Sequence, residues 1–163
     1  MVLLDTNILL YTLAQASPFH EAARSLYRQV VDGALEACVS PQVLCEFVAT
    51  CTDARRFQPV LSVERALHEC RIFWEARSLR KIFPSAGAFE TALGLIRRHR
   101  VSRQEVFDAF LAATMLDNGV TMIYTANAKD FLPFRELQVV NPFEHLASAS
   151  ETVGRRPRHP KES

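Results

Sequence analysis

The stretch Val2-Leu3-Leu4-Asp5-Thr6-Asn7 is the most informative part of the sequence, because an apolar run ends there on a carboxylate and two small polar groups. Three consecutive apolar residues favour a short buried β-strand, and the polar residues mark its end. Asp5 then has two open interpretations. It is either the N-cap of a helix that begins at residue 6, a position that aspartate fills well, or a functional carboxylate at the end of a strand.

The rest of the sequence alternates short apolar runs with longer helical patterns. Strands are expected at residues 2–4, 36–39, 81–83, 120–124 and 138–140. Helices are expected at residues 6–15, 19–31, from 41 onward, 63–74, 89–96 and from 102 to about 118. This order predicts an α/β fold with a central, mostly parallel sheet flanked by helices. Ligands bind beyond the carboxyl ends of strands in such sheets, and Asp5 and residues 125–130 both follow a strand.

The chain has 163 residues, of which 48% are apolar, so it can form one compact domain with a core. We expect this domain at residues 1–146 and a disordered tail at residues 147–163, where Val153 is the only large apolar residue. The apolar runs are too short to cross a membrane, and Asp5 interrupts the first of them too early for a signal peptide. We therefore expect a cytoplasmic protein.

Charge is nearly balanced, since residues 1–150 contain 15 basic and 16 acidic side chains. A protein that held nucleic acid through its overall charge would be strongly basic, so any such binding here requires local patches. Two sets of basic residues are candidates, and each also fits a solvated helix face. They are Arg97, Arg98, Arg100 and Arg103, and the looser set Arg71, Arg77, Arg80 and Lys81.

The four cysteines are Cys38, Cys45, Cys51 and Cys70. They form no C-x-x-C pair and have no matching cluster of histidines, which argues against a zinc site or a disulfide framework. We expect them to be small buried apolar residues.

Asp108 is the only charged residue in the apolar segment Val106–Ala113. Ser102 and Glu105 have the spacing of a capping box, which predicts that the helix carrying this segment begins there. The helical neighbours of Asp108 are apolar, so it projects from a row that faces the core. An unpaired carboxylate there would cost on the order of several kcal/mol unless a cation or donor meets it. Asp108 is therefore a candidate site residue.

Glu46 follows Ser40, the expected N-cap of its helix, by six residues, as Asp108 follows Ser102. Both acids would then project from the second turn of a helix, near its electropositive end. The helical face that carries Glu46 is mixed in polarity. Glu46 is therefore either an exposed surface acid or a functional residue.

Four segments carry these residues and resemble, in this order, the motifs of the PIN-domain ribonucleases. They are Leu3–Asn7, Ser40–Phe47, Phe107–Thr114 and Tyr124–Phe131. Within that family the chain most resembles the VapC toxins of bacterial toxin–antitoxin pairs, over about residues 1–146. The resemblance implies a three-layer sandwich and an endoribonuclease that cleaves RNA phosphodiester bonds.

The resemblance also implies that Asp5, Glu46 and Asp108 are catalytic and bind one or two Mg²⁺ or Mn²⁺ ions. These hard cations prefer oxygen ligands, and no histidine falls in the acidic motifs. A bound ion would activate a water molecule and stabilise charge in the transition state. Thr6 and Asn7 would orient Asp5 or a metal-bound water molecule, while Thr125 would contact the site or a phosphate. Because Asp5 would lie beside Glu46 and Asp108, its functional interpretation is favoured over the N-cap interpretation.

One position departs from the family pattern. The family often has a fourth acid where this chain has Asn127, and the nearby acid is Asp130. Either Asn127 is a neutral ligand, or Asp130 reaches the ion, or three acids bind it alone. The missing acid also supports an alternative from a different class, a catalytically silent PIN-like binding module that acts through a partner.

Other enzyme classes lack their usual marks, since the sequence contains no G-x-S-x-G elbow and no phosphate-binding glycine loop. For partners, the resemblance implies an RNA substrate, a cognate antitoxin protein and a second copy of the chain in a homodimer. It does not imply any association with a membrane.

Overall fold

The computed structural model describes residues 1–144, so the tail expected at residues 147–163 lies outside the described residues. Five short strands form one sheet in the order β3-β2-β1-β4-β5, and every neighbouring pair is parallel. The strands are β1 (Val2–Leu4), β2 (Ala37–Val39), β3 (Leu79–Lys81), β4 (Met122–Tyr124) and β5 (Gln138–Val140). The predicted parallel sheet is therefore confirmed.

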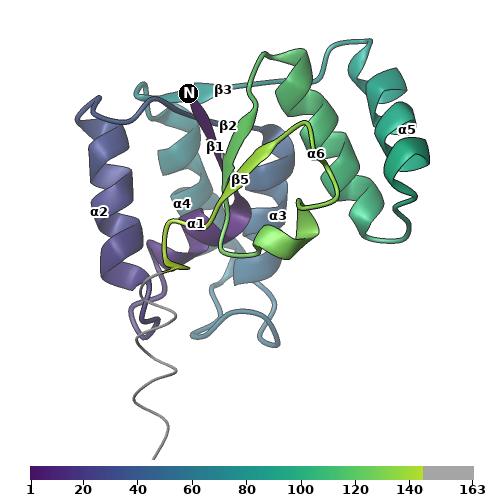
Figure 1. The fold of residues 1–163 in the computed structure, drawn as a ribbon. Helices are drawn as coiled ribbons and strands as arrows, with labels where there is room; N and C mark the ends of the chain where they lie inside the picture. Colours follow the sequence, from purple (N-terminus) through teal and green to yellow (C-terminus); the bar gives the residue numbers. More distant parts are fainter. Residues whose placement is uncertain (145–163) are drawn as a thin grey trace, which may run out of the picture.

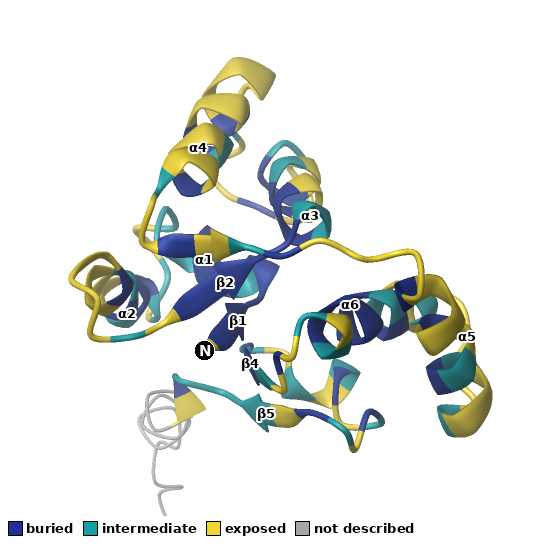
Figure 2. Cartoon of the chain, turned by 90° about the horizontal axis from the view of Figure 1, so that it is seen from above, coloured by how far each residue is buried: buried dark blue, intermediate teal, exposed yellow. Residues whose placement is uncertain are grey.

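Six helices connect the strands and cover the sheet. They are α1 (Thr6–Tyr11), α2 (His20–Val31), α3 (Pro41–Cys51), α4 (Val63–Glu75), α5 (Ala88–His99) and α6 (Glu105–Asp117). A single 3₁₀ turn, η1 (Ala128–Asp130), follows β4. Figures 1 and 2 show α2 and α4 on one side of the sheet and the packed pair α5 and α6 on the other. The layers are thus helix, sheet and helix, as predicted, and none of the helices in residues 1–144 is both long and apolar enough to span a bilayer.

The strand order creates a switch point between β1 and β4. From β1 the chain adds β2 and then β3 on one side, and it returns across the sheet to place β4 on the other side of β1. Because crossovers between parallel strands are right-handed, this reversal sends α5 and α6 to the opposite face. The connections leaving β1 and β4 diverge, which opens a crevice beyond their carboxyl ends. Asp5 and the loop after Tyr124 lie at that crevice.

The core lies on both faces of the sheet. Every residue of β1 and β2 is buried, which explains why these strands read as continuous apolar runs, and Figure 2 shows both in dark blue. On the α3 side, Phe47 is fully buried and meets the ring of Phe73 from α4 edge-on at a centroid distance of 5.4 Å. Contacts of this kind fix α3, and with it the position of Glu46.

Some expected boundaries are wrong for local reasons. The third strand ends at Lys81, because its register with β2 pairs Ala37 with Leu79 and Val39 with Lys81. Phe83, expected in that strand, is exposed and packs edge-on against Trp74. The first helix ends at Tyr11 and does not reach residue 15.

The last helix begins at Glu105 and not at Ser102. Half of the expected capping box forms, since the Ser102 amide donates to Glu105 Oε2 at 3.0 Å, but Arg103 has a φ of 55° and interrupts the helical path. Gln104 therefore occupies the N-cap position. At the other end Gly119 adopts a φ of 68°, the left-handed conformation that glycine adopts at low cost, and ends the helix where expected.

The expectation that all four cysteines are buried is wrong for two of them. Cys38 and Cys51 are buried, Cys70 is half-buried, and Cys45 lies on the exposed face of α3. No disulfide forms, as expected, since all four thiols are free.

Replacing Phe47 with alanine should lower the free energy of unfolding by about 3–5 kcal/mol, because it leaves a cavity between α3 and α4. Urea denaturation followed by circular dichroism measures the change. Phe89→Ala is the matched control, since the Phe89 side chain on α5 is exposed and should cost far less. Equal losses in the two variants would contradict this account of the core.

Candidate active site

Asp5 is a buried carboxylate that ends β1 and begins α1. It is 7% exposed, and its backbone amide donates to the carbonyl of Tyr124 at 3.0 Å, which extends the pairing with β4. The side chain accepts from the Thr6 amide at 2.7 Å and caps α1, so the N-cap interpretation is confirmed. One carboxylate oxygen makes this contact, and the other faces the neighbouring loop.

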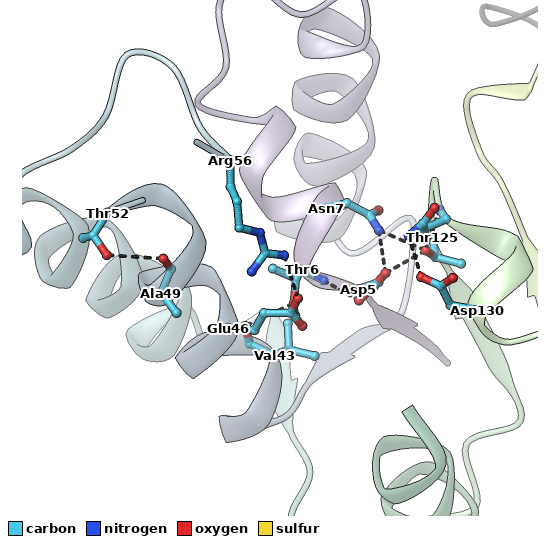
Figure 3. Close-up of polar contacts among 11 residues, drawn as sticks. Asp5, Thr6, Asn7, Val43, Glu46, Ala49, Thr52, Arg56, Thr125 and Asp130 are labelled. Carbon is cyan, nitrogen blue, oxygen red and sulfur yellow. Dashed lines mark hydrogen bonds and ion pairs between the residues drawn. The ribbon is translucent and has the colours of Figure 1, made fainter. Parts of the chain in front are cut away.

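The second oxygen of Asp5 is held from two elements, as Figure 3 shows. Thr125 Oγ1 donates to Oδ2 at 2.6 Å, and Asn7 Nδ2 donates to the same atom at 2.6 Å. Asn7 also accepts from the Ala126 amide at 2.8 Å, which ties α1 to the loop after β4. Despite these donors, burial raises the pKa of Asp5 to about 6, and the nearby charge of Glu46 adds to the rise.

Glu46 lies in the second turn of α3, as expected, and it is exposed. Ser40 caps this helix by accepting from the Val43 amide at 3.3 Å, with Pro41 at its first position. Glu46 Oε2 accepts from Thr6 Oγ1 at 3.1 Å, and Glu46 Oε1 pairs with Arg56 Nη2 at 3.5 Å. Glu46 therefore reaches Thr6, next to Asp5, although it lies on the solvent side.

Asp108 is half-buried in the first turn of α6, one turn earlier than expected because the helix starts late. Its neighbours Leu111, Ala112 and Met115 are buried, which confirms that it projects from the core-facing row. Burial raises the pKa of Asp108 to about 7, and the charges of Asp130, Asp5 and Glu46 raise it further. No hydrogen bond or ion pair within residues 1–144 compensates this carboxylate.

Asp130 belongs to the same group of acids. It ends η1, and Asn127 Nδ2 donates to its Oδ2. The Asn127 amide donates to Thr125 Oγ1 at 2.9 Å, so the loop is anchored to the residue that holds Asp5. Asn127 stands at the position where the family often has an acid, and its side chain holds the carboxylate of Asp130.

These side chains line one cleft of about 290 Å³ at the switch point. Gln42 of α3 donates to the carbonyl of Phe107 in α6 at 2.9 Å, and both residues line a wider groove that shares Glu46 and Asp108 with the cleft. Within the described residues, no three acidic, histidine or cysteine side chains are close enough to form a ready-made metal site. Four carboxylates share the cleft. They are Asp5, Glu46, Asp108 and Asp130.

The basic sets singled out in the sequence do not line this cleft. Arg98 pairs with Glu136, and Arg71 pairs with Glu75 one turn along α4. The cation that does lie in the cleft is Arg56, from the loop between α3 and α4. No sequence signal marks it, because it is one of two adjacent arginines in a loop without periodicity.

The PIN domain family matches residues 2–138, which is most of the chain. The chain belongs to the PIN-domain family. This PIN domain is also 28% identical over 142 residues to Ribonuclease VapC24 of Mycobacterium tuberculosis, covering 87% of this chain and 97% of the relative.

Solved structures support the fold of this PIN domain. VapBC2 from Rickettsia felis, bound to a DNA fragment from its promoter, matches with a TM-score of 0.60 and 19% identity, covering 86% of this chain and 98% of the other. A toxin–antitoxin complex from Klebsiella pneumoniae matches with a TM-score of 0.59 and 20% identity, covering 88% and 99%. VapC20 of Mycobacterium tuberculosis, a toxin that cleaves the sarcin-ricin loop, matches with a TM-score of 0.58 and 18% identity, covering 77% and 88%.

The buried acids predict that the metal-free protein loses stability as the pH rises. Folding raises the pKa of Asp5 to about 6 and of Asp108 to about 7, from an ordinary value of 3.8, so the folded protein holds more protons than the unfolded chain between these limits. Ionisation of these two carboxyl groups therefore costs no folding stability below pH 3.8 and reaches its full cost above pH 7. Melting temperatures in EDTA should therefore fall from about pH 5 to about pH 8.

Asp108→Asn removes one of these titrating groups, so its melting temperature should fall less over the same range. Glu90→Gln, which changes an exposed carboxylate on α5, is the control and should keep the wild-type slope. A wild-type slope in Asp108→Asn would show that Asp108 ionises freely in the folded protein.

Proposed function

We propose that this chain is a metal-dependent endoribonuclease and the toxin of a VapBC-type toxin–antitoxin pair. The observation that carries the proposal is the cleft at the switch point of a PIN domain, where four carboxylates converge without a basic residue to neutralise Asp108. The similarity to Ribonuclease VapC24 supports the same activity.

The donor set fits Mg²⁺ or Mn²⁺, because the cleft offers carboxylate oxygens and contains no histidine or cysteine. Burial and, after it, repulsion from the neighbouring carboxylates raise the pKa of Asp108, and a bound cation would offset both by favouring the charged form. We assign the metal ligands to Asp5, Asp108 and Glu46, with Asp130 in support. When bound, such an ion supplies positive charge for the transition state of phosphodiester cleavage and lowers the pKa of an attacking water molecule.

The acidic side chains of the site differ in how firmly they are held. Thr125 and Asn7 hold the carboxylate of Asp5 in one orientation through bonds of 2.6 Å each. Asp108 makes no such bonds and Glu46 is exposed, so both can turn toward Asp5 by changing side-chain torsions. Single-stranded or looped RNA is the substrate that we assign, since an unpaired backbone can enter a narrow cleft.

The partners follow from the same proposal. The R. felis and K. pneumoniae proteins that this fold resembles were solved as toxin–antitoxin complexes. We infer that this chain is neutralised by its own antitoxin protein, forms a homodimer and acts in the cytoplasm. Co-expression with the product of an adjacent small open reading frame should relieve the growth arrest caused by this chain alone.

A second candidate is a catalytically silent PIN-like module that acts through a partner. Two observations favour it: the carboxylates of residues 1–144 form no ready-made metal site, and Asn127 stands at the fourth acidic position. Isothermal titration with Mn²⁺ separates the candidates. Absence of binding at millimolar Mn²⁺ would favour the silent module.

Asp5→Asn and Asp108→Asn should each reduce Mg²⁺-dependent RNA cleavage by at least about 100-fold, because each removes a charge that the ion requires. Cleavage of a fluorescent single-stranded RNA measures the rates. Asp32→Asn, which changes an exposed residue at the end of α2, should cleave at the wild-type rate. Wild-type activity in either site variant would exclude this mechanism.

Asp130→Asn decides which side chain replaces the missing fourth acid. If Asp130 supports the ion, the variant should bind Mn²⁺ about three- to tenfold more weakly, a loss of one charge at the edge of the site. Calorimetric titration gives the affinity. Unchanged affinity would leave Asp5, Glu46 and Asp108 as the complete acidic set.

A further inference from the structure

Arg56 is the one cationic side chain, within residues 1–144, that lines the acidic cleft and the wider groove that continues it toward α6. Figure 3 shows it reaching from the loop between α3 and α4 toward Glu46 and Thr6. The adjacent Arg55 points elsewhere and forms a close pair with Asp53, 2.8 Å between Nη2 and Oδ2. Two neighbouring arginines in one loop thus have different surroundings.

The contact between Arg56 and Glu46 is suited to exchange. Its N–O distance is 3.5 Å, and the two side chains are 54% and 47% exposed. Exposed pairs of this kind contribute little to stability, roughly 0–1 kcal/mol. Arg56 is therefore not needed to hold the fold, and a stronger partner for either group would separate the pair.

This pair also bears on why the acids of the cleft are not gathered. Glu46 Oε1 is paired with Arg56, and Glu46 Oε2 accepts from Thr6 Oγ1 at 3.1 Å, so both of its oxygens already have a partner. A divalent cation that binds Glu46 must compete with the guanidinium for the same carboxylate. Binding of such a cation would release Arg56 from Glu46, within a cleft whose net negative charge would then be smaller.

We propose that Arg56 pairs with Glu46 in the metal-free cleft and contacts the scissile phosphate of RNA once a divalent cation has taken Glu46. The proposal rests on the proposed nuclease function. A guanidinium presents a planar fork of N–H donors that matches two phosphate oxygens, and it stays protonated throughout. Such a contact strengthens as negative charge builds on the phosphate, so it lowers the barrier to cleavage.

The test combines Mn²⁺ affinity with RNA cleavage in two variants and one control. Arg56→Gln removes the competitor of the ion, so it should bind Mn²⁺ about two- to fivefold more tightly. It should also lower kcat for RNA cleavage by about 100-fold, through loss of transition-state charge. These opposite effects are not expected of a side chain that only supports the fold.

Arg56→Lys keeps the charge and loses the fork. It should bind Mn²⁺ like the wild type and lower kcat by about tenfold. Arg55→Gln is the matched control and should leave both quantities unchanged, because Arg55 pairs with Asp53 outside the cleft. Melting temperatures of all three proteins should equal that of the wild type, and Arg56→Lys carries the test if Arg56→Gln does not fold.

Weaker or unchanged Mn²⁺ binding in Arg56→Gln would overturn the competition for Glu46. A wild-type kcat in both Arg56 variants would overturn the contact with phosphate. Failure of the nuclease proposal gives a different result, namely a wild-type protein that cleaves no RNA. The Mn²⁺ titrations contain no RNA and would still test the pairing of Arg56 with Glu46.

Discussion

The placement of one buried carboxylate constrains the whole site. Asp5 stands where β1 ends, and its removal from water raises its pKa to about 6 even though three groups donate to it. Those donors come from both sides of the switch point, so the carboxylate joins the start of α1 to the loop after β4. The parallel register that pairs Leu4 with Tyr124 makes this possible, because it brings Asp5 and Thr125 level at the edge of the sheet.

The carboxylates of Asp108 and Glu46 are held less firmly than that of Asp5, which bears on how the site could bind a cation. Asp108 and Glu46 project from early turns of two helices that lie on different sides of the crevice, with Gln42 linking those helices by its bond to Phe107. Their backbones are fixed by core packing, while their carboxylates have few or weak partners. A site of this kind can close around a cation without moving the fold, since only side-chain torsions need to change.

Local pattern was sufficient for the features of the fold that depend on burial and strand order. Apolar runs at residues 2–4 and 36–39 predicted strands of a parallel sheet, and the structure has buried strands at Val2–Leu4 and Ala37–Val39. The apolar neighbours of Asp108 predicted that it projects from a core-facing row, and those neighbours are buried. Boundaries failed where a tertiary contact prevailed over local preference. The strand at Leu79–Lys81 follows the register of its neighbour, although Ile82 and Phe83 are the more apolar residues.

The position of Arg56 in the cleft could not be predicted from the sequence, for a related reason. Its loop has no periodicity, and its closeness to Glu46 arises only when α3 and the following turn fold back beside α1. The two basic sets were conspicuous because their members lie close together in the sequence, yet none of them lines the cleft, and Arg71 and Arg98 pair with Glu75 and Glu136. Basic residues that are close together in the sequence are typical of an exposed helix face. The charge of a cleft depends instead on which loops the fold brings together.

An acidic cleft and a polyanionic substrate repel each other, and the near-neutral charge of the chain offers no general attraction to offset this. RNA can therefore enter only after positive charge has been concentrated at the carboxylates. One cation inside the cleft cannot balance four acids, so Arg56 alone does not suffice, and the proposed mechanism therefore requires that a divalent ion bind before RNA. The proposed order would separate a resting protein, in which Arg56 pairs with Glu46, from a loaded one, in which the same arginine would contact phosphate.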